Sequence, residues 1–216
     1  MENKNEEKWF RLCGRIAVEG SFERTRAMHK WTFAGIVRAY MSEGRAYHNF
    51  SHIEQCLDEF EQVGCFLRNP DAVEFALWYH DIIYDASAKD NEERSARVAV
   101  LQASDLGFSV AFTEKVSRLI LATKHDVVPE DSDAKMMADI DLSIFGQSED
   151  KFDEYERRIR QEYSWVPKED FCRGRAGILQ IFLDRSTIFS TMQFRNRYEL
   201  QARKNLVRAR NLLQRP

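Results

Sequence analysis

Prolines and glycines, the residues that most often end helices and form tight turns, are scarce in this sequence. The chain has four prolines and nine glycines among 216 residues. Strand-like alternation of polar and apolar residues is also rare. Nearly every segment instead has apolar residues three and four positions apart, which is the period of an amphipathic helix. The sequence therefore predicts an all-α fold.

Long apolar runs are absent as well. No stretch approaches the roughly 20 consecutive apolar residues that a membrane-spanning helix needs. The first eight residues are mostly polar and charged, and they contain no apolar signal region. We therefore expect no membrane association and a cytoplasmic location.

Cysteine is present, but not in the spacing that marks a disulfide framework or a zinc knuckle. The four cysteines form no Cys-x-x-Cys pair and lie in helix-like segments: Cys13, Cys56, Cys65 and Cys172. We expect them to be reduced thiols of the core.

Neither sign of charge is in large excess. The net charge of -3 argues against a general nucleic-acid-binding protein, although a local basic patch stays open. The 44% hydrophobic and 31% charged fractions are those of an ordinary globular protein. Because the chain has no repeat, low-complexity tract or long linker, we predict one all-α domain over residues 1–216, with residues 1–6 disordered.

Apolar spacing and helix-ending residues predict the individual helices. The expected ranges are 7–18, 22–42 with Gly44 as C-cap, 49–67, a central helix opened by Asn69-Pro70, 91–105, 109–124, 134–145, 149–163, 167–184 and 194–213. Polar loops are expected at residues 86–90 and 127–133.

The central helix carries a histidine followed directly by an aspartate, His80-Asp81, in the middle of an apolar stretch over residues 76–85. A buried carboxylate without a partner costs several kcal/mol, so an ion pair or a metal is expected. The two side chains point about 100° apart on a helix, yet both can reach one ion between neighbouring helices. The alternative is a His–Asp hydrogen bond that only joins two helices.

Further candidate ligands lie on both sides of this dipeptide. His48 and His52 are four residues apart and share a helix face, and His125 lies at the mouth of a loop. Asp139 and Asp141 interrupt an otherwise apolar run. We expect the fifth histidine, His29, to be an ordinary helix-face residue. Imidazole and carboxylate together suit divalent ions such as Mn²⁺, Fe²⁺, Ni²⁺ or Zn²⁺, with Mg²⁺ a further candidate, rather than calcium.

Five short motifs run through most of the chain. They are Tyr47-His48-Asn49-x-x-His52, Trp78-Tyr79-His80-Asp81-x-x-Tyr84-Asp85, Asn91-Glu92-x-x-Ser95-Ala96, Asp139-x-Asp141-Leu142-Ser143-Ile144-x-Gly146 and Phe171-x-x-Gly174-Arg175. This string resembles the HD-domain superfamily, and within it the subgroup of predicted metal-dependent HD phosphohydrolases. The resemblance covers residues 31–210, with the HD signature at 48–141. It implies a helical bundle with a central metal site, on which the helices of 149–213 pack.

The resemblance also implies a ligand set, which is His52, His80, Asp81 and one of the two late aspartates. Asp139 and Asp141 lie about 200° apart on a helix, so they cannot both face the ion equally. We favour Asp141, because the second aspartate of the motif resembles the superfamily's last ligand. Asp139 then orients a ligand rather than binding the ion. His48 either joins the site or orients His52, and we favour the second role.

The resemblance further implies hydrolysis of a phosphate ester or anhydride, of a small and nucleotide-like molecule. A bound divalent ion acidifies water and so provides a nucleophile near neutral pH. Asp85, expected one helical turn after Asp81, is a general-base candidate or a solvated helix-end carboxylate. Glu92 is either a favourable first-turn charge or a partner of the ligands.

Cations are expected to bind the phosphate. Lys124, Arg173 and Arg175 are the best placed by motif. His125 is a candidate for binding a second ion or the leaving phosphate, or for neither role. Alarmone hydrolases of the superfamily carry a Glu-Asp pair where this chain has Tyr84-Asp85, which argues against alarmone chemistry.

Two rival functions stay open at this level. One is a di-iron oxygenase of the HD type, in which His48 and His125 would be additional ligands. The other is a non-catalytic sensor that binds a metal or nucleotide and controls a partner. The expected ligands are a divalent ion and a small phosphorylated molecule; nucleic acid is not expected, and a homo-oligomer stays open.

Overall fold

A computed structural model describes residues 2–17 and 22–214. Within these ranges the chain forms α-helices and short 3-10 helices and no strand, which confirms the all-α prediction. None of the helices in the described part of the chain is long and apolar enough to cross a membrane.

The chain divides into two compact units, Met1–Met137 and Ala138–Pro216. The boundary falls inside helix α7 (Ser132–Asp141), where no proline, glycine or polar linker interrupts the sequence. Because no such signal is present, the division could not be predicted, and the single-domain organisation stays a prediction. Each unit is described by itself.

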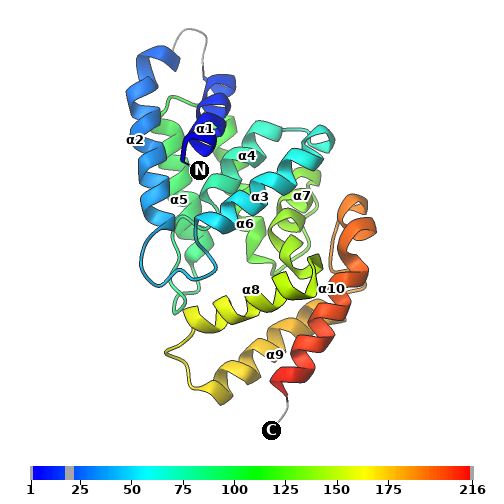
Figure 1. Cartoon of the computed structure of the whole chain (residues 1–216). Helices are drawn as coiled ribbons and strands as arrows, with labels where there is room; N and C mark the ends of the chain where they lie inside the picture. Colours follow the sequence, from blue (N-terminus) through cyan, green and yellow to red (C-terminus); the bar gives the residue numbers. More distant parts are fainter. Residues whose placement is uncertain (1, 18–21, 215–216) are drawn as a thin grey trace. The chain divides into compact units, whose positions relative to one another are not determined.

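Unit 1 contains six helices before α7 among its described residues, which can be followed from blue to green in Figure 1. They are α1 (Glu2–Ile16), α2 (Phe22–Tyr40), α3 (Phe50–Val63), α4 (Pro70–Tyr79), α5 (Asn91–Asp105) and α6 (Val110–Leu121), with the 3-10 turns η1 (Gly64–Phe66) after α3 and η2 (Ala122–Lys124) after α6. Helix α4 contacts α1, α3, α5 and α6 and is therefore the centre of this unit.

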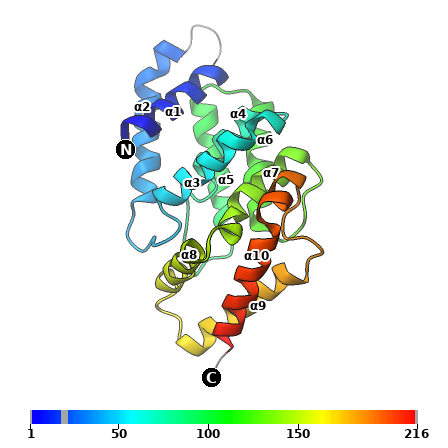
Figure 2. The same cartoon turned by 45° about the vertical axis from the view of Figure 1, so that its right-hand side comes forward.

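Unit 2 begins with the last turn of α7 and continues through the 3-10 segment η3 (Leu142–Gly146). Three longer helices follow: α8 (Glu149–Glu162), α9 (Lys168–Asp184) and α10 (Met192–Leu213). Helices α9 and α10 pack side by side, as Figure 2 shows in orange and red, and α10 also packs on η3.

Most predicted boundaries agree with the structure to within a few residues, and α5 agrees at both ends. Its end is a Schellman motif: Gly107 has φ 79°, its N–H donates to Ser104, and Phe108 N–H donates to Ala103. Gly44 also has a positive φ, of 86°, but α2 ends at Tyr40, so Gly44 belongs to the turn that follows rather than to the cap.

The central helix is shorter than predicted. Helix α4 ends at Tyr79, so His80 is its C-cap and Asp81 lies in the turn beyond, not in the middle of a helix. Asn69 stands at the N-cap as expected but makes no side-chain capping bond, because its amide donates to Asp133 instead. The apolar pattern could not reveal the helix end, because apolar residues, Ile82 and Ile83, continue beyond it.

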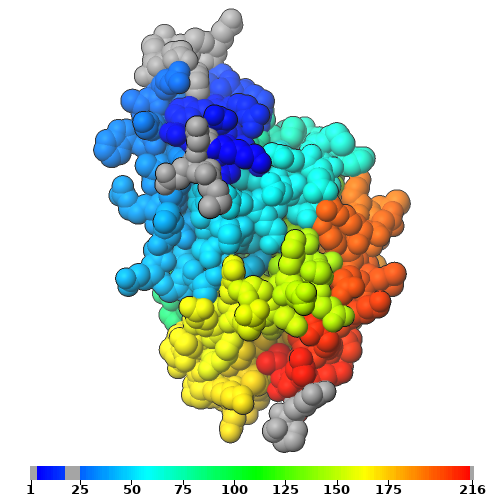
Figure 3. Space-filling model, viewed as in Figure 1, coloured from blue at the N-terminus to red at the C-terminus, as the bar shows by residue number. Residues whose placement is uncertain are grey.

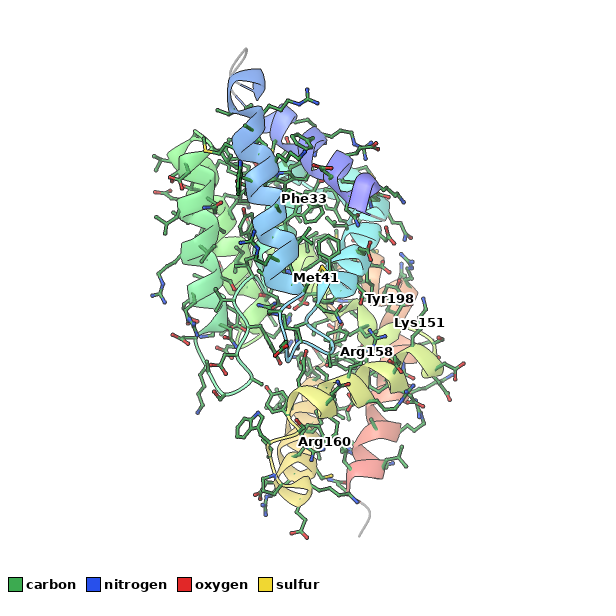
Figure 4. The ribbon with its side chains drawn as sticks, turned by 60° about the vertical axis from the view of Figure 1, so that its left-hand side comes forward. Phe33, Met41, Lys151, Arg158, Arg160 and Tyr198 are labelled. Atoms are coloured by element: carbon green, nitrogen blue, oxygen red, sulfur yellow. The ribbon has the colours of Figure 1, made fainter. Side chains whose placement is uncertain are left out.

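The core of unit 1 is built from aromatic rings. Trp9 of α1 and Trp78 of α4 are both fully buried and meet edge to face, with centroids 6.0 Å apart. Phe33 of α2, labelled in Figure 4, meets Trp78 edge to face as well. Such side chains bury roughly 150–250 Å² each and dominate core energetics, so this cluster fixes α4 against α1 and α2.

The N-terminal residues are more ordered than predicted. Helix α1 begins at Glu2, whereas we predicted disorder over residues 1–6; residue 1 lies outside the described part. Asn5 donates to Glu54 at 2.7 Å, and the buried Lys8 pairs with Asp58 and Glu61. These contacts tie α1 to the polar face of α3, whose surface adjoins α1 in Figure 3 (cyan beside dark blue).

The core of unit 2 is also aromatic, and it requires one glycine. Phe145 of η3 meets Phe152, Tyr155 and Phe182 edge to face. A Cβ on Gly146 would overlap the Tyr198 side chain of α10, closer than real Cβ contacts come. Gly146 therefore permits the close approach of α10 to η3.

The cysteines agree with the prediction in part. All four are free; Cys13 and Cys56 are buried, whereas Cys65 is exposed and Cys172 is half-buried. The prediction of core thiols is thus wrong for Cys65, which lies in η1 rather than on a helix face.

Candidate metal centre

The histidine nearest the start of α3 is placed by that helix's cap. Asn49 is the N-cap, and its Oδ1 accepts from the backbone N–H of Ser51 at 2.9 Å. Residue 52 therefore lies in the first turn of α3, and its imidazole is buried. The helix start, not the interior of a long helix, presents His52.

His80 is fixed by its own helix end. Its Nδ1 lies 2.9 Å from the carbonyl oxygen of Leu77. A carbonyl oxygen only accepts, so Nδ1 carries the hydrogen and the lone pair is on Nε2. This is the arrangement in which a histidine ligand is oriented by a backbone carbonyl.

Three ligand atoms of unit 1 converge. The Nε2 atoms of His52 and His80 are 3.1 Å apart, and Asp81 Oδ2 lies 3.5 Å and 3.3 Å from them. Two donors bound to one cation at about 2.1 Å, at angles of about 95–110°, lie about 3.1–3.4 Å apart. The three atoms therefore fit one face of a coordination shell around a divalent ion.

The purely structural alternative fits less well. A His–Asp hydrogen bond would bring nitrogen and oxygen to about 2.7–3.2 Å, and neither Nε2 is that close to Asp81 Oδ2. His52 can donate to His80 as one neutral imidazole to another. That bond explains the two rings but leaves unexplained why the carboxylate faces both of them.

Cys56 lies beside these ligands, whereas the sequence predicts only a reduced core thiol at this position. His52, Cys56 and His80 offer ligand atoms within 4.8 Å of one another, and such a group could hold a metal ion. The sulfur, however, is 3.8 Å from His52 Nδ1 and 3.7 Å from Nε2, so it does not lie along either lone pair. Cys56 thus packs against the ring. Its position four residues after His52 on one helix was the signal available in the sequence.

Asp85 is not placed as predicted. Because α4 ends at Tyr79, Asp85 is not one helical turn beyond Asp81. Its exposed carboxylate accepts from the hydroxyl of Ser87 at 2.7 Å and from the Ser87 backbone at 2.9 Å. These bonds lower the pKa of Asp85 below its ordinary value, which weakens it as a proton acceptor.

The first turn of α5 carries two glutamates with opposite pKa shifts. Burial, with the negative charge of Asp81 adding to it, raises the pKa of Glu92. Glu93 pairs with Lys124 at 2.5 Å, and this contact lowers the pKa of Glu93 and raises that of Lys124. Glu92 is therefore close enough to Asp81 to feel its charge, while the predicted cation Lys124 is bonded to a neighbour.

The other three histidines are His48, His125 and His29, and each has contacts or a position of its own. The ring of His48 stacks on Tyr84, with centroids 4.0 Å apart, and is 6.0 Å from the ring of His52. His125 is the C-cap of η2, with φ 57°. His29 is buried, bonded to Thr25 Oγ1 at 3.0 Å, and its pKa is lowered by burial, so the prediction of an ordinary helix-face residue is wrong.

In unit 2, Asp139 caps a helix. Its carboxylate is buried and accepts from the backbone N–H groups of Ser190 and Thr191, each at 2.7 Å, and from the Thr191 hydroxyl at 2.6 Å. Thr191 is the N-cap of α10. Both oxygens are used in this way, so the carboxylate is committed to the start of α10.

The predicted phosphate-binding arginines are both paired within unit 2. Arg175 is buried and donates to Glu156 at 2.5 Å and to the Tyr155 hydroxyl at 2.7 Å. Arg173 is exposed and pairs with Asp170. Neither guanidinium therefore has all its donors available for a phosphate.

The favoured fourth ligand, Asp141, is half-buried at the end of α7. Burial raises the pKa of Tyr155 to about 12, and the negative charge of Asp141 adds to this rise. The role of Asp141 as a ligand stays a prediction.

No family model, curated protein or solved structure matches this chain. The likeness to HD-domain phosphohydrolases therefore rests on the motifs quoted above and stays a prediction.

Proposed function

We propose that this protein is a metal-dependent phosphohydrolase in which His52, His80 and Asp81 hold a divalent cation. The observation that carries the proposal is the convergence of two imidazole nitrogens and one carboxylate oxygen within 3.1–3.5 Å of one another. Mn²⁺, Fe²⁺, Ni²⁺ and Zn²⁺ suit this mixed set of donors better than calcium does.

Such a cation supplies Lewis-acid polarisation and acidifies water, which is the chemistry that phosphoester hydrolysis needs. The chain's own residues prepare the site. The Leu77 carbonyl holds the hydrogen of His80 on Nδ1, so that the lone pair of Nε2 is available to the ion. Both His52 and His80 are buried, so bulk water has little access to their rings.

A small phosphate ester or anhydride, nucleotide-like in character, is the proposed substrate class. Lys124 is the cation of the first unit that we assign to the phosphate; a bound phosphate would compete with its present partner Glu93. Asp141, the fourth ligand named by the resemblance, belongs to unit 2, and Asp141→Asn tests its participation separately.

The first test is metal retention. Wild type, His52→Gln, His80→Gln and Asp81→Asn are passed through gel filtration and analysed for bound metal. We expect wild type to keep one ion per chain and each variant to lose most of it. His29→Gln is the matched control, because His29 is also a buried histidine of unit 1 but lies outside the cluster. Full retention by His80→Gln and Asp81→Asn would overturn the assignment.

The second test is turnover. Nucleotides and simple phosphoesters are screened with each candidate ion added, and we expect phosphate release that a chelator abolishes. Tight binding of an unaltered nucleotide would indicate a sensor instead. Two bound irons with an O₂-dependent spectral change would indicate an oxygenase.

A further inference from the structure

We propose that Arg45 is a positioning residue for the metal site: its guanidinium ties the segment before His52 to the turn that carries Asp81. This inference rests on the proposed function, since it assigns Arg45 a role toward the same ligands. None of the five sequence motifs contains this arginine.

The contacts of Arg45 define the role. Nη1 donates to the carbonyl oxygens of His48 at 3.1 Å and Asp81 at 2.6 Å. Nη2 donates to the carbonyl oxygen of Ile82 at 2.9 Å. One planar group thus bridges two chain segments that are far apart in sequence, which a rigid fork of donors does better than a point charge.

The bridge reaches ligands on both sides. His48 immediately precedes Asn49, the N-cap that starts α3 and so places His52. On the other side, the backbone of Asp81 is held at both ends, because its N–H donates to the Tyr40 hydroxyl at 3.3 Å and its carbonyl accepts from Arg45. Asp81 follows the end of α4, where carbonyl groups lack helical partners; Arg45 supplies donors there.

Aromatic rings keep the guanidinium in place. Its carbon lies 5.2 Å from the ring centroid of Tyr40 and 5.8 Å from that of Tyr84, distances typical of cation–π contacts. Tyr84 in turn stacks on His48. Nε donates to Ser42 at 3.1 Å, so all three guanidinium nitrogens already donate, and direct capture of a substrate phosphate is not the role we assign.

A second arginine of the chain offers a matched control. Arg160, labelled in Figure 4 on α8, donates to the carbonyl oxygens of Tyr163 and Val166 and lies 4.7 Å from the ring of Phe171. It is the same kind of clamp on a loop, but that loop carries none of the proposed ligands. Loss of Arg160 should therefore affect stability alone.

The experiment measures Co²⁺ affinity and the visible spectrum of the Co²⁺ form in wild type, Arg45→Lys and Arg160→Lys. Loss of a residue that orients ligands typically weakens metal binding about 10–100-fold, and we expect this for Arg45→Lys together with a changed spectrum. Arg160→Lys should bind Co²⁺ within about twofold of wild type, as expected for a residue that touches no ligand or ligand-bearing segment. Equal affinity and identical spectra for the two variants would overturn the proposal.

Additional variants distinguish a failure to fold, a wrong metal site and a wrong role for Arg45. If Arg45→Lys does not fold, Arg45→Gln, which keeps one amide donor, is measured instead with the same expectation. If His52→Gln and His80→Gln also retain Co²⁺, the proposed metal site itself is wrong. If those two lose it while Arg45→Lys does not, only the positioning role is wrong.

Discussion

Asp133 and Asp139 lie on the same helix, α7, and each has a buried carboxylate that accepts backbone N–H groups just before another helix. Asp133, in unit 1, accepts from Arg68 at 2.8 Å and Asn69 at 3.1 Å, at the start of α4. Asp139, in unit 2, does the same for Ser190 and Thr191 before α10. One difference between the two sites is that a lysine, Lys115, contacts Asp133 directly.

The two carboxylates have pKa values shifted in opposite directions. Burial acts to raise both pKa values. At Asp133 the bonds from Arg68, Asn69 and Lys115, whose Nζ is 3.2 Å away, outweigh burial, and the pKa lies below its ordinary value. At Asp139 burial outweighs the bonds from Ser190 and Thr191, and the pKa is raised. Similar helix caps therefore titrate in opposite directions.

The largest effect is expected for Asp133→Asn. Asparagine removes the charge that pairs with Lys115 and turns an amide donor toward the buried N–H groups of Arg68 and Asn69. Buried groups left without a partner cost about 1–3 kcal/mol each, so we expect a loss of about 3 kcal/mol. Chemical denaturation at pH 7 measures the change in the free energy of unfolding. Asp131→Asn is the control, since Asp131 pairs with the same lysine but is half-exposed; it should change the free energy by less than about 1 kcal/mol. Equal losses of unfolding free energy in Asp133→Asn and Asp131→Asn would show that the burial of Asp133 does not increase its contribution to stability.

Gly146→Ala should disturb the packing of α10 on η3 in unit 2, and it should leave the contacts of Asp133 in unit 1 unchanged. The added Cβ would overlap Tyr198, and overpacking of this kind costs about 2 kcal/mol. Gly174→Ala in α9 is the control, because no atom lies within 4 Å of the position that its Cβ would take; there alanine should be neutral or stabilise the helix by up to about 1 kcal/mol. Thermal unfolding of both variants measures the difference, and a destabilised Gly174→Ala with an intact Gly146→Ala would contradict the packing described.

A smaller loss, about 1–2 kcal/mol, is expected for Asp139→Asn, since one of two accepting oxygens is replaced by a donor. A carboxyl with a raised folded pKa contributes stability that is present below its unfolded pKa and lost as pH rises through the folded value. The difference in unfolding free energy between wild type and Asp139→Asn should therefore be larger at about pH 3.5, which is below the unfolded pKa, than at pH 7. The same variant should keep its metal, whereas we predict that Asp141→Asn does not. A difference that grows with pH would contradict the raised pKa.

The smallest effect, about 1 kcal/mol at pH 7, is expected for Lys115→Met, because the backbone donors to Asp133 remain. In wild type the folded pKa of Asp133 is below 3.8, so its contribution is present above the unfolded pKa and is lost as pH falls through the folded pKa. Without the lysine, the folded pKa of Asp133 should rise, so that less stability is lost on acidification than in wild type. Acid unfolding curves of wild type and Lys115→Met measure this difference. Arg118 is an exposed cation on the same helix, and Arg118→Met should lose as much stability with falling pH as wild type does.

Some parts of the candidate site could be predicted from the sequence, and others could not. His52, His80 and Asp81 were selected from the order of their residue types, and the structure brings them together. The motif containing Asp139 and Asp141 was equally visible, but no spacing rule shows that Asp139 faces the start of α10, which lies some fifty residues later. Arg45 was missed because its role depends on backbone carbonyl oxygens, which leave no pattern in the sequence. Cys56 was missed although its place four residues after His52 was visible, because that spacing alone does not show that the thiol contacts the ring.

Local sequence was sufficient to show that the chain is helical, where most helices begin and end, and which polar residues interrupt apolar stretches, since these follow from periodicity and capping. Long-range packing was needed to learn that α4 ends before Asp81, that Arg45 holds the turn beyond it, and that Asp139 caps α10 while Asp133 pairs with Lys115. A helix period is set by neighbours three and four residues away, whereas the ionisation of a buried group is set by whichever distant donors the packing brings to it.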